Sequence, residues 1–364
     1  MRVRKTDKIF FGIVCALLIL GSLVFISASL GLLARNGASF SSVAGKQFIS
    51  ILIGCVMAIV VSKVPYVFWR RYSFYIFLAS IVITLLVFVP KIGLEYGGGK
   101  RWINLGFFSL QPAEFLKIAF VMYAATWLSA AKERVRTFKD GILPIIIMLA
   151  IVGAILLAQP DTDTFVSIFL AAMGMFIVAG GRFRDLLILA GGAVAGFVGL
   201  VYTRPYLMER ITTFFDPTRD PLGASYQIQQ SLIAIGSGEI FGRGFGQSIQ
   251  KFSYLPEPIG DSIFAVAGEE FGFVGSVFLI LMFLFFTLRS LQIAAKSPDM
   301  FGGLLVTGIA ILITSASFMN IASMLGIIPL SGLPLLFVSH GGSAMIFTLL
   351  QVGIILNVSK FKKT

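Results

Sequence analysis

Ten long apolar runs, separated by short polar segments, constrain the fold of this chain more than any other feature. The runs begin near Ile9, Gln47, Ser73, Pro112, Ile142, Thr164, Leu186, Ser262, Gly303 and Ala344. A helix needs about 20 apolar residues to cross the hydrocarbon core of a bilayer. It also satisfies internally the backbone hydrogen bonds that lipid cannot provide. We therefore predict an all-α polytopic membrane protein with about ten transmembrane helices.

The composition places nearly the whole chain in one membrane domain. Of 364 residues, 57% are hydrophobic and only 13% are charged, whereas about 25% of a typical soluble domain is charged. Residues 1–364 are therefore expected to form a single transmembrane domain. The first run follows the basic residues Arg2 and Arg4 without a convincing cleavage site, so we expect an uncleaved helix rather than a signal peptide.

The distribution of positive charge predicts the orientation of the helices. The formal net charge is +12, but Lys and Arg lie between apolar runs and not with aromatic residues on a soluble segment, which argues against nucleic-acid binding. If successive segments alternate sides, the larger share of Lys and Arg falls on the side of both termini. The positive-inside rule then predicts that both termini are cytoplasmic.

The longest segment between apolar runs, residues 205–261, lies between the seventh and eighth expected helices and is predicted to be extracytoplasmic. It carries Arg210, Arg219, Arg243 and Lys251, against the positive-inside rule. Long loops escape that rule, so one interpretation is a solvated loop that was translocated regardless of charge. The other interpretation is a site for an anionic ligand.

The sequence gives no support to several kinds of chemistry. Cys15 and Cys55 lie inside apolar runs and are interpreted as small packing residues. His340 is the only histidine, which excludes a His-rich zinc site. No GxxxxGK[ST] phosphate loop occurs in the sequence, so ATP is not expected as an energy source.

Charged residues also lie within the expected helices, where an isolated charge is costly. Glu114 and Lys117 are three residues apart and are expected to pair on one helix face, either as a structural ion pair or along a substrate path. Glu269 and Glu270 lie about two turns into the eighth run. At least one of them is expected to face a polar cavity or a cation, and Lys117 is a candidate partner.

The short polar turn 159–164, QPDTDT, holds two carboxylates next to Pro160. An aspartate in a turn commonly caps the local backbone, and this structural interpretation is favoured for Asp163. Asp161 is a candidate for a functional role.

Within the long segment, residues 225–235 have apolar and polar residues at helical spacing, which predicts a short amphipathic helix. The glycine-rich stretch 236–248 follows and is able to turn backbone amides toward an anion. Pro256 and Pro258 then stiffen the chain before Asp261. Asp261 is either the N-cap of the next helix or a chemical group, and the local sequence leaves both open.

The stretch GQSIQKFSYLPE (246–257) resembles the FtsW branch of the SEDS family, and five separated motifs resemble the SEDS family of FtsW, RodA and SpoVE as a whole. They are KRWINLGFFSLQPAEFLK (100–117), QPD with Thr164, DPTRDPLGASYQIQQSLIAIGSGEIFGRGFG (216–246), YLPE with Asp261 and IFAVAGEEFGFVG, and GIIPLSGLPLLFVSHGGSAM (326–345). There are departures from the family pattern. Asp163 stands where the family commonly has glycine and His340 where it has tyrosine, while Ile259, Gly260 and Ser262 differ around the aspartate.

The resemblance implies a multi-pass protein of the bacterial cytoplasmic membrane that polymerises peptidoglycan strands from lipid II at the outer face. It also implies a class B penicillin-binding protein as partner, together with other divisome or elongasome proteins and membrane lipids. Asp261 is then the catalytic residue, expected to act as general base in an inverting glycosyl transfer. Substrate contacts are expected from Arg101, Glu114, Lys117, Asp161, Arg210, Gln230, Arg243, Lys251, Glu257, Glu270 and Ser339.

In this reaction the diphosphate leaving group needs positive charge, which Arg101, Arg210, Arg243 and Lys251 are expected to supply. No protein metal site is expected, although a Mg²⁺ or Mn²⁺ ion at the diphosphate can share that task. Two rival functions remain at this point. A lipid II flippase would use the charges within the helices as a polar path, and a divisome scaffold would use no chemistry at all. Division, elongation and sporulation roles are not separated by the sequence.

Overall fold

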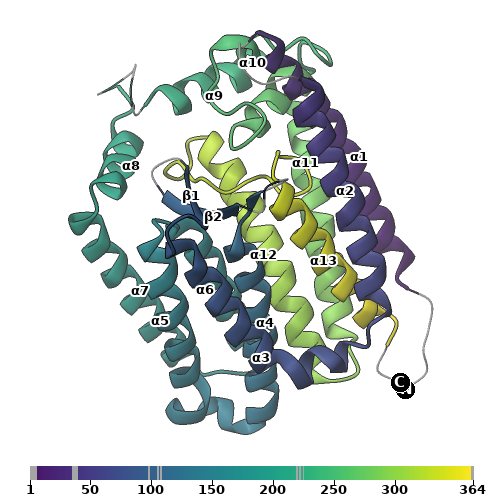
Figure 1. The fold of residues 1–364 in the computed structure, drawn as a ribbon, viewed down its shortest axis with the longest axis vertical. Helices are drawn as coiled ribbons and strands as arrows, with labels where there is room; N and C mark the ends of the chain where they lie inside the picture. Colours follow the sequence, from purple (N-terminus) through teal and green to yellow (C-terminus); the bar gives the residue numbers. More distant parts are fainter. Residues whose placement is uncertain are drawn as a thin grey trace.

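The computed structural model describes residues 6–34, 40–96, 99–104, 106, 109–218, 220, 223 and 225–361. Arg2, Arg4 and Arg219, which contribute to the expected charge asymmetry, lie outside these ranges. The chain forms an upright bundle of long helices with a smaller group of short elements at one end (Figure 1).

The ten long helices of the bundle correspond to the ten apolar runs. They are α1 (Lys8–Leu30), α2 (Phe40–Lys63), α3 (Tyr66–Leu85), α4 (Pro112–Ala131), α5 (Leu143–Ala158), α6 (Thr162–Val178), α7 (Phe183–Thr203), α11 (Ile263–Ala295), α12 (Met300–Met324) and α13 (Gly342–Ser359). Within the described ranges, nine are long and apolar enough to cross a membrane, and α6, with 17 residues, is the shorter tenth. The expected all-α polytopic fold is confirmed.

Short elements fill the connections. The long segment 205–261 contains α8 (Pro205–Phe215), α9 (Tyr226–Ser237) and α10 (Gln250–Ser253), and α9 confirms the predicted amphipathic helix. Short 3-10 turns occupy Gly31–Ala34, Leu86–Phe88 and Lys132–Arg136, and a π-helical turn occupies Phe138–Ile142.

A three-stranded antiparallel sheet was not expected from the sequence. Its strands are β1 (Gly93–Tyr96), β2 (Gly99–Asn104) and β3 (Ser109–Leu110), in the order β1-β2-β3, with Leu94 opposite Trp102 and Ile103 opposite Leu110. Strands this short do not show the alternation of apolar and polar residues that identifies a strand in a sequence. The sheet matters for function because β2 carries Arg101.

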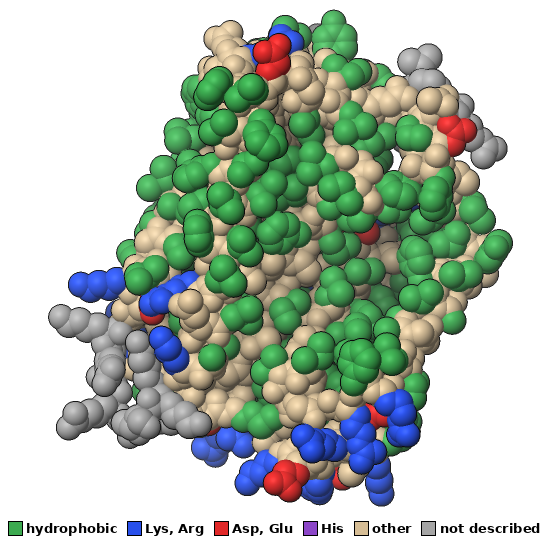
Figure 2. Space-filling view, turned by 180° about the vertical axis from the view of Figure 1, so that it is seen from behind, with side chains coloured by type: hydrophobic (Ala, Val, Ile, Leu, Met, Phe, Trp, Pro, Cys, Tyr) green, Lys and Arg blue, Asp and Glu red, His purple; other side chains and the backbone are tan. Residues whose placement is uncertain are grey.

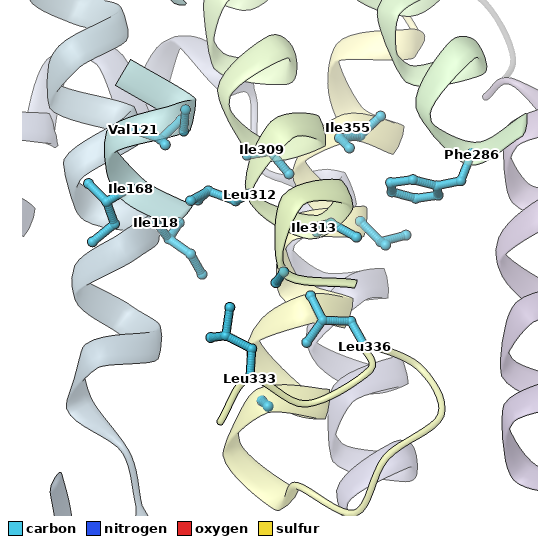
Figure 3. Packing of buried hydrophobic residues seen from close by; sticks show 14 of the residues in the cluster. Ile118, Val121, Ile168, Phe286, Ile309, Leu312, Ile313, Leu333, Leu336 and Ile355 are labelled. Atoms are coloured by element: carbon cyan, nitrogen blue, oxygen red, sulfur yellow. The ribbon is translucent and has the colours of Figure 1, made fainter. Parts of the chain in front are cut away.

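The most buried helices are α4, α12 and α13. In the 18-residue apolar stretch of each of these three helices, more than 70% of the residues are buried. The corresponding share in α7, which lies at the edge of the bundle, is 6% (Figure 1). Figure 3 shows the packing between them: Ile118 and Val121 of α4 face Ile309 and Leu312 of α12. Leu333 and Leu336, from the segment between α12 and α13, close this core on the side of Asp261.

The beginning of α1 and the ends of α11 and α13 lie at the same end of the bundle. Arg289 of α11 pairs with Asp7 at 2.7 Å, and the Asp7 backbone amide donates to the Ser359 hydroxyl at 3.2 Å. Helix α11 is interrupted by non-helical φ and ψ angles at Gly272, and its first residues lie near α9 and α10 at the opposite end of the bundle (Figure 1). Most Lys and Arg side chains gather at the lower end in Figure 2, opposite α9 and α10.

Close packing of α2 against α13 depends on Gly353. A Cβ atom at this position would lie 2.6 Å from the carbonyl oxygen of Ala58. Overpacking a core typically costs roughly 1–3 kcal/mol, so we expect Gly353→Val to lower the thermal unfolding temperature of the purified protein in detergent. Gly12→Val is the matched control, since a Cβ at Gly12 meets no atom within 4 Å. Equal unfolding temperatures for the two variants would contradict this packing.

Candidate active site

Asp261 is held in place through the backbone around it. The side chain of Asn320, fully buried in α12, donates hydrogen bonds to the carbonyl of Asp261 at 2.7 Å and to the carbonyl of Leu333 at 2.8 Å. The Ser339 hydroxyl donates to the carbonyl of Gly260 at 2.8 Å. The segment between α12 and α13 therefore fixes the position of Asp261 without using its carboxylate.

The carboxylate of Asp261 does not cap α11. That helix begins at Ile263 with Ser262 as its N-cap residue, and the amide of Gln227 in α9 donates to the Ser262 hydroxyl at 3.1 Å. Among the described residues, none donates a hydrogen bond to the Asp261 side chain. Of the two interpretations left open by the sequence, capping is thus wrong, and the carboxylate is left available for another role.

Three charged side chains converge on Gly332, in the segment before α13. A Cβ atom at Gly332 would lie 3.6 Å from Asp163 Oδ2, 3.8 Å from Arg210 Nη2 and 3.9 Å from Asp261 Oδ2. Arg210 Nη1 pairs with Asp163 Oδ2 at 3.0 Å, and the Gly332 amide donates to the same oxygen at 2.9 Å. Glycine at 332 leaves the space among these groups free of a side chain.

A cavity of 340 Å³ adjoins this cluster and shares Arg210 with it. Its second cation is Arg101 of β2, whose guanidinium donates to the carbonyls of Gln159, at 3.1 Å, and Pro160. The rest of the wall is largely apolar or aromatic: Pro160, Tyr206, Phe214, Ile228, Ile328 and Leu330, with Glu209 and Thr213. Two guanidinium groups on a largely apolar wall, with one acid at Glu209, suit a ligand with an anionic group and an apolar part.

The surroundings of Asp261 raise its pKa to about 7. Burial is the largest cause, because it disfavours the charged form, and the negative charges of Glu257 and Asp163 act in the same direction. Arg210 and Arg101 lower the pKa but do not cancel the effect. A carboxylate that titrates near neutral pH is well suited to accept a proton during a reaction.

The local cap in this turn is Asp161 and not Asp163, while a substrate contact from Asp161 stays a prediction. Asp161 is the N-cap of α6 and accepts from the Thr164 amide at 3.3 Å, while the Gln111 side chain donates to its other oxygen at 3.4 Å. Burial raises the pKa of Asp161. Asp163, expected to be a local cap, instead reaches Arg210. The spacing within QPDTDT could not reveal this, because α8 lies far along the chain.

Glu114 and Lys117 form the expected ion pair, at 2.8 Å, and both side chains are almost completely buried in α4. Oε2 of Glu114 has no hydrogen-bond partner among the described residues. Neither residue lines the cavity described above.

Glu269 and Glu270 belong to a second, separate charged cluster. Lys251 pairs with Glu270 at 2.6 Å and donates to the Ser27 hydroxyl at 3.0 Å, and Arg243 lies 3.6 Å from Glu269. The suggestion of Lys117 as partner for these acids was therefore wrong. Lys251 is fully buried, so this cluster joins α1, α11 and the long segment instead of facing the cavity.

Backbone amides at the end of the glycine-rich stretch and directly after it point toward an anion, but the anion belongs to the chain itself. The amides of Ile249 and Gln250 donate to the Glu269 carboxylate, at 3.0 and 3.3 Å, and the Ser248 amide donates to Glu270 at 3.3 Å. Positive φ angles at Gly242, Gly244 and Gly246 allow the chain to make these turns. Arg243, Lys251 and Glu270 are thus not brought to the cavity.

The remaining candidates lie around the site without lining the cavity. Glu257 is exposed next to Asp261, Ser339 is buried in the segment that holds it, and Gln230 is half-buried on α9. The sequence did not single out Asn320 or Gly332 as site residues. Gly332 lies inside the quoted motif of residues 326–345, whereas nothing in the local sequence marks Asn320.

Comparisons with known proteins agree over nearly the whole chain. The family model FTSW_RODA_SPOVE, described as cell cycle protein, matches residues 7–364. Stage V sporulation protein E of Bacillus subtilis (strain 168) is 36% identical over 365 residues, covering 100% of both chains. A protein of Trichlorobacter lovleyi named probable peptidoglycan glycosyltransferase FtsW is 38% identical, covering 98% of this chain and 94% of the relative.

Solved structures share the fold. A chain from a study of a peptidoglycan synthase complex that coordinates polymerization and crosslinking superposes with a TM-score of 0.81, at 26% identity, covering 97% of each chain. The rod shape determining protein RodA of Thermus thermophilus superposes with a TM-score of 0.69, at 23% identity, covering 97% of this chain and 96% of that one. At that identity the second likeness concerns the fold alone.

The pair of Lys251 and Glu270 offers a test of the second cluster. Lys251→Met leaves the buried Glu270 charge without its cation, so we expect a loss of roughly 3–5 kcal/mol of stability, measured by unfolding in detergent. The double variant Lys251→Met with Glu270→Gln removes both charges and keeps an acceptor for the Ser248 amide. It should regain most of the loss. A double variant as unstable as the single one would contradict the pairing.

Proposed function

The chain belongs to the FtsW/RodA/SpoVE family, and we propose that it is a peptidoglycan glycosyltransferase that polymerises glycan strands from lipid II, with Asp261 as general base. The observation that carries the proposal is the position of the Asp261 carboxylate, close to Arg210 beside a cavity with two guanidinium groups. Relatives at 36–38% identity over nearly the full chain include a probable peptidoglycan glycosyltransferase, which supports the same activity here.

In the proposed reaction, the C4 hydroxyl of one lipid II GlcNAc attacks C1 of the MurNAc at the end of a growing strand. A C–O bond forms at C1 while the bond from C1 to the diphosphate breaks. Asp261 accepts the hydroxyl proton as the new bond forms, because a neutral sugar hydroxyl is a weak nucleophile. An α-linked donor and a β-linked product require a single inverting displacement, so no covalent enzyme intermediate is needed.

The diphosphate leaves as an anion and needs positive charge more than it needs a proton. Arg101 and Arg210 are the cations that line the cavity. Lys251, which is paired with Glu270 in the separate cluster, is less suited to this task than the sequence alone suggested. The described residues contain no group of three or more His, Cys, Asp or Glu side chains that could hold a metal ion. A Mg²⁺ or Mn²⁺ ion at the diphosphate stays a prediction.

We further propose that the site faces the outer leaflet of the bacterial cytoplasmic membrane and that both termini are cytoplasmic. The cavity end lies opposite the end where Lys and Arg gather (Figure 2), which the positive-inside rule associates with the cytoplasm. The polyprenyl tails of both substrates can then remain in lipid. A class B penicillin-binding protein is the proposed partner, because a structural relative comes from a synthase complex that couples polymerization to crosslinking.

Replacing Asp261 tests the assignment most simply. We expect Asp261→Asn to be inserted and folded as the unaltered protein is, but to lose polymerisation of purified lipid II, since an amide does not accept the hydroxyl proton. Glu239→Gln, at an exposed carboxylate of the same long segment, is expected to polymerise at the unaltered rate. Strand formation by Asp261→Asn would reject Asp261 as the base.

Two further measurements separate the rival functions. A flippase would move labelled lipid II across the membrane of vesicles and would not polymerise substrate supplied at the outer face. A scaffold would support growth of cells that carry Asp261→Asn. Either result, obtained without polymerisation that depends on Asp261, would contradict the glycosyltransferase assignment.

The raised pKa of Asp261 predicts the pH dependence of polymerisation. Below about 7 the carboxylate is mostly protonated and is unable to accept the hydroxyl proton, and above about 7 it is ionised. The initial rate with lipid II should therefore rise with pH through a midpoint near 7. A rate that stays constant between pH 5.5 and pH 8, which spans roughly one unit or more on each side of that midpoint, would contradict this role.

A further inference from the structure

Asp163 occupies a position that the proposed mechanism does not yet use. It lies in the first turn of α6, with one carboxylate oxygen shared between the Arg210 guanidinium, at 3.0 Å, and the Gly332 amide, at 2.9 Å. The Asp261 carboxylate belongs to the same group around Gly332. Arg210 therefore pairs with one acid, lies in the same group as a second, and lines the open cavity.

The ion pair of Arg210 with Asp163 is accessible to exchange. The Arg210 side chain is 31% exposed and that of Asp163 is 19% exposed, so water reaches both partners. Partly exposed pairs of this kind are worth about 1 kcal/mol or less. A diphosphate carries more negative charge than one carboxylate and offers oxygens for bidentate contact with a guanidinium, so it is able to compete for Arg210.

Arg210 is also supported independently of Asp163. Its guanidinium lies 6.0 Å from the centre of the Tyr206 ring, and the Tyr206 hydroxyl is hydrogen-bonded to Thr162 of α6 at 2.7 Å. These contacts keep α8 docked on α6. The guanidinium can therefore change its partner without releasing the helix.

We infer that Asp163 is a positioning residue that holds Arg210 beside Asp261 while the cavity contains no anion, and gives up Arg210 when a diphosphate group enters. This inference rests on the proposed function. Once Arg210 turns to the diphosphate, Asp163 keeps its negative charge next to Asp261 without a counterion. Asp261 then holds a proton more strongly, so the base is strengthened only when the donor is in place.

The charged groups around the two acids support this coupling. Asp261 faces Asp163 from α6, Arg210 from α8, Arg101 from β2 and Glu257 from its own segment. Asp161 lies close to Asp163 on the same turn. In the described part of the site, Arg210 pairs directly with a carboxylate and Arg101 does not. A movement of Arg210 therefore changes the electrostatic field at Asp261 more than a movement of Arg101 does.

Binding of inorganic pyrophosphate to the full-length protein in detergent tests the competition for Arg210. Asp163→Asn keeps the acceptor for the Gly332 amide but removes the charge, and we expect it to bind pyrophosphate about threefold to fivefold more tightly by calorimetry. In an Arg210→Gln background, the same substitution should bring no gain, because no guanidinium is left to release.

Glu239→Gln is the matched control for net charge. Glu239 is an exposed carboxylate of the same long segment as Arg210 and does not line the cavity. It should tighten pyrophosphate binding less than Asp163→Asn does. Equal effects of the two substitutions, or a gain that persists without Arg210, would overturn the competition.

The pH profile of lipid II polymerisation tests the effect on Asp261. Loss of the negative charge at Asp163 removes one cause of the raised pKa of Asp261, so the midpoint of Asp163→Asn should fall by roughly one pH unit. Glu239→Gln should leave the midpoint unchanged, and Asp163→Glu, which keeps the negative charge, should keep the midpoint of the unaltered protein. A merely structural ion pair would lower stability and leave the midpoint where it was, which would overturn the inference.

These outcomes are distinct from failure of the proposed function. If the unaltered protein does not polymerise lipid II, the glycosyltransferase assignment fails. If it polymerises and Asp163→Asn has an unchanged midpoint and unchanged pyrophosphate affinity, only the role of Asp163 is rejected.

Discussion

The proposed site depends on one electrostatic arrangement. The Asp261 carboxylate is half-buried at the end of a membrane bundle, among both acidic and basic side chains. Burial and two neighbouring acids favour its protonated form, while Arg210 and Arg101 favour the ionised form. The balance leaves a carboxyl group that titrates near neutral pH. The same two arginines line the cavity, so the groups that lower the pKa of Asp261 are also placed to contact an anionic ligand.

The bundle contains two charged clusters with different physical roles. Around Gly332 the ion pair is partly exposed and adjoins a cavity, which allows its partners to exchange. Around Glu270 the ions are fully buried and hydrogen-bonded to Ser27 and to backbone amides, which ties the long segment to α1 and α11. A buried pair of this kind is costly to break. The second cluster therefore fixes the scaffold on which the first one operates.

Much of the fold was predictable from the sequence, because the hydrophobic thickness of a bilayer imposes a length that apolar runs must match. All ten runs became helices, and the amphipathic pattern of residues 225–235 became α9. The small sheet was missed because its strands are too short to show a period. The pairing of Glu114 with Lys117 was predictable from helical spacing, whereas the partners of Glu269 and Glu270 come from a distant segment that helical spacing does not address.

At the site, the motifs identified Asp261 and Arg101, and Arg210 was singled out by its charge in the long segment, but the sequence QPDTDT did not show which of Asp161 and Asp163 meets a cation. Both lie in one turn, and only the position of α8 decides which of them meets a cation. Asn320 was missed for a related reason, since its function is to hold a carbonyl that is 59 residues away in the sequence. Contacts between segments far apart in the chain were the part of the site that local pattern could not reveal.

We propose that Asp261 accepts a proton from the sugar hydroxyl that attacks the donor. The most direct measurement is a structure of the full-length protein with a non-reactive lipid II analogue at both substrate positions. If Asp261 is the base, one of its oxygens should lie within about 2.6–3.2 Å of the acceptor C4 hydroxyl, and the diphosphate should contact Arg101 and Arg210. An acceptor hydroxyl bound elsewhere, with Asp261 walled off from both sugars, would contradict it.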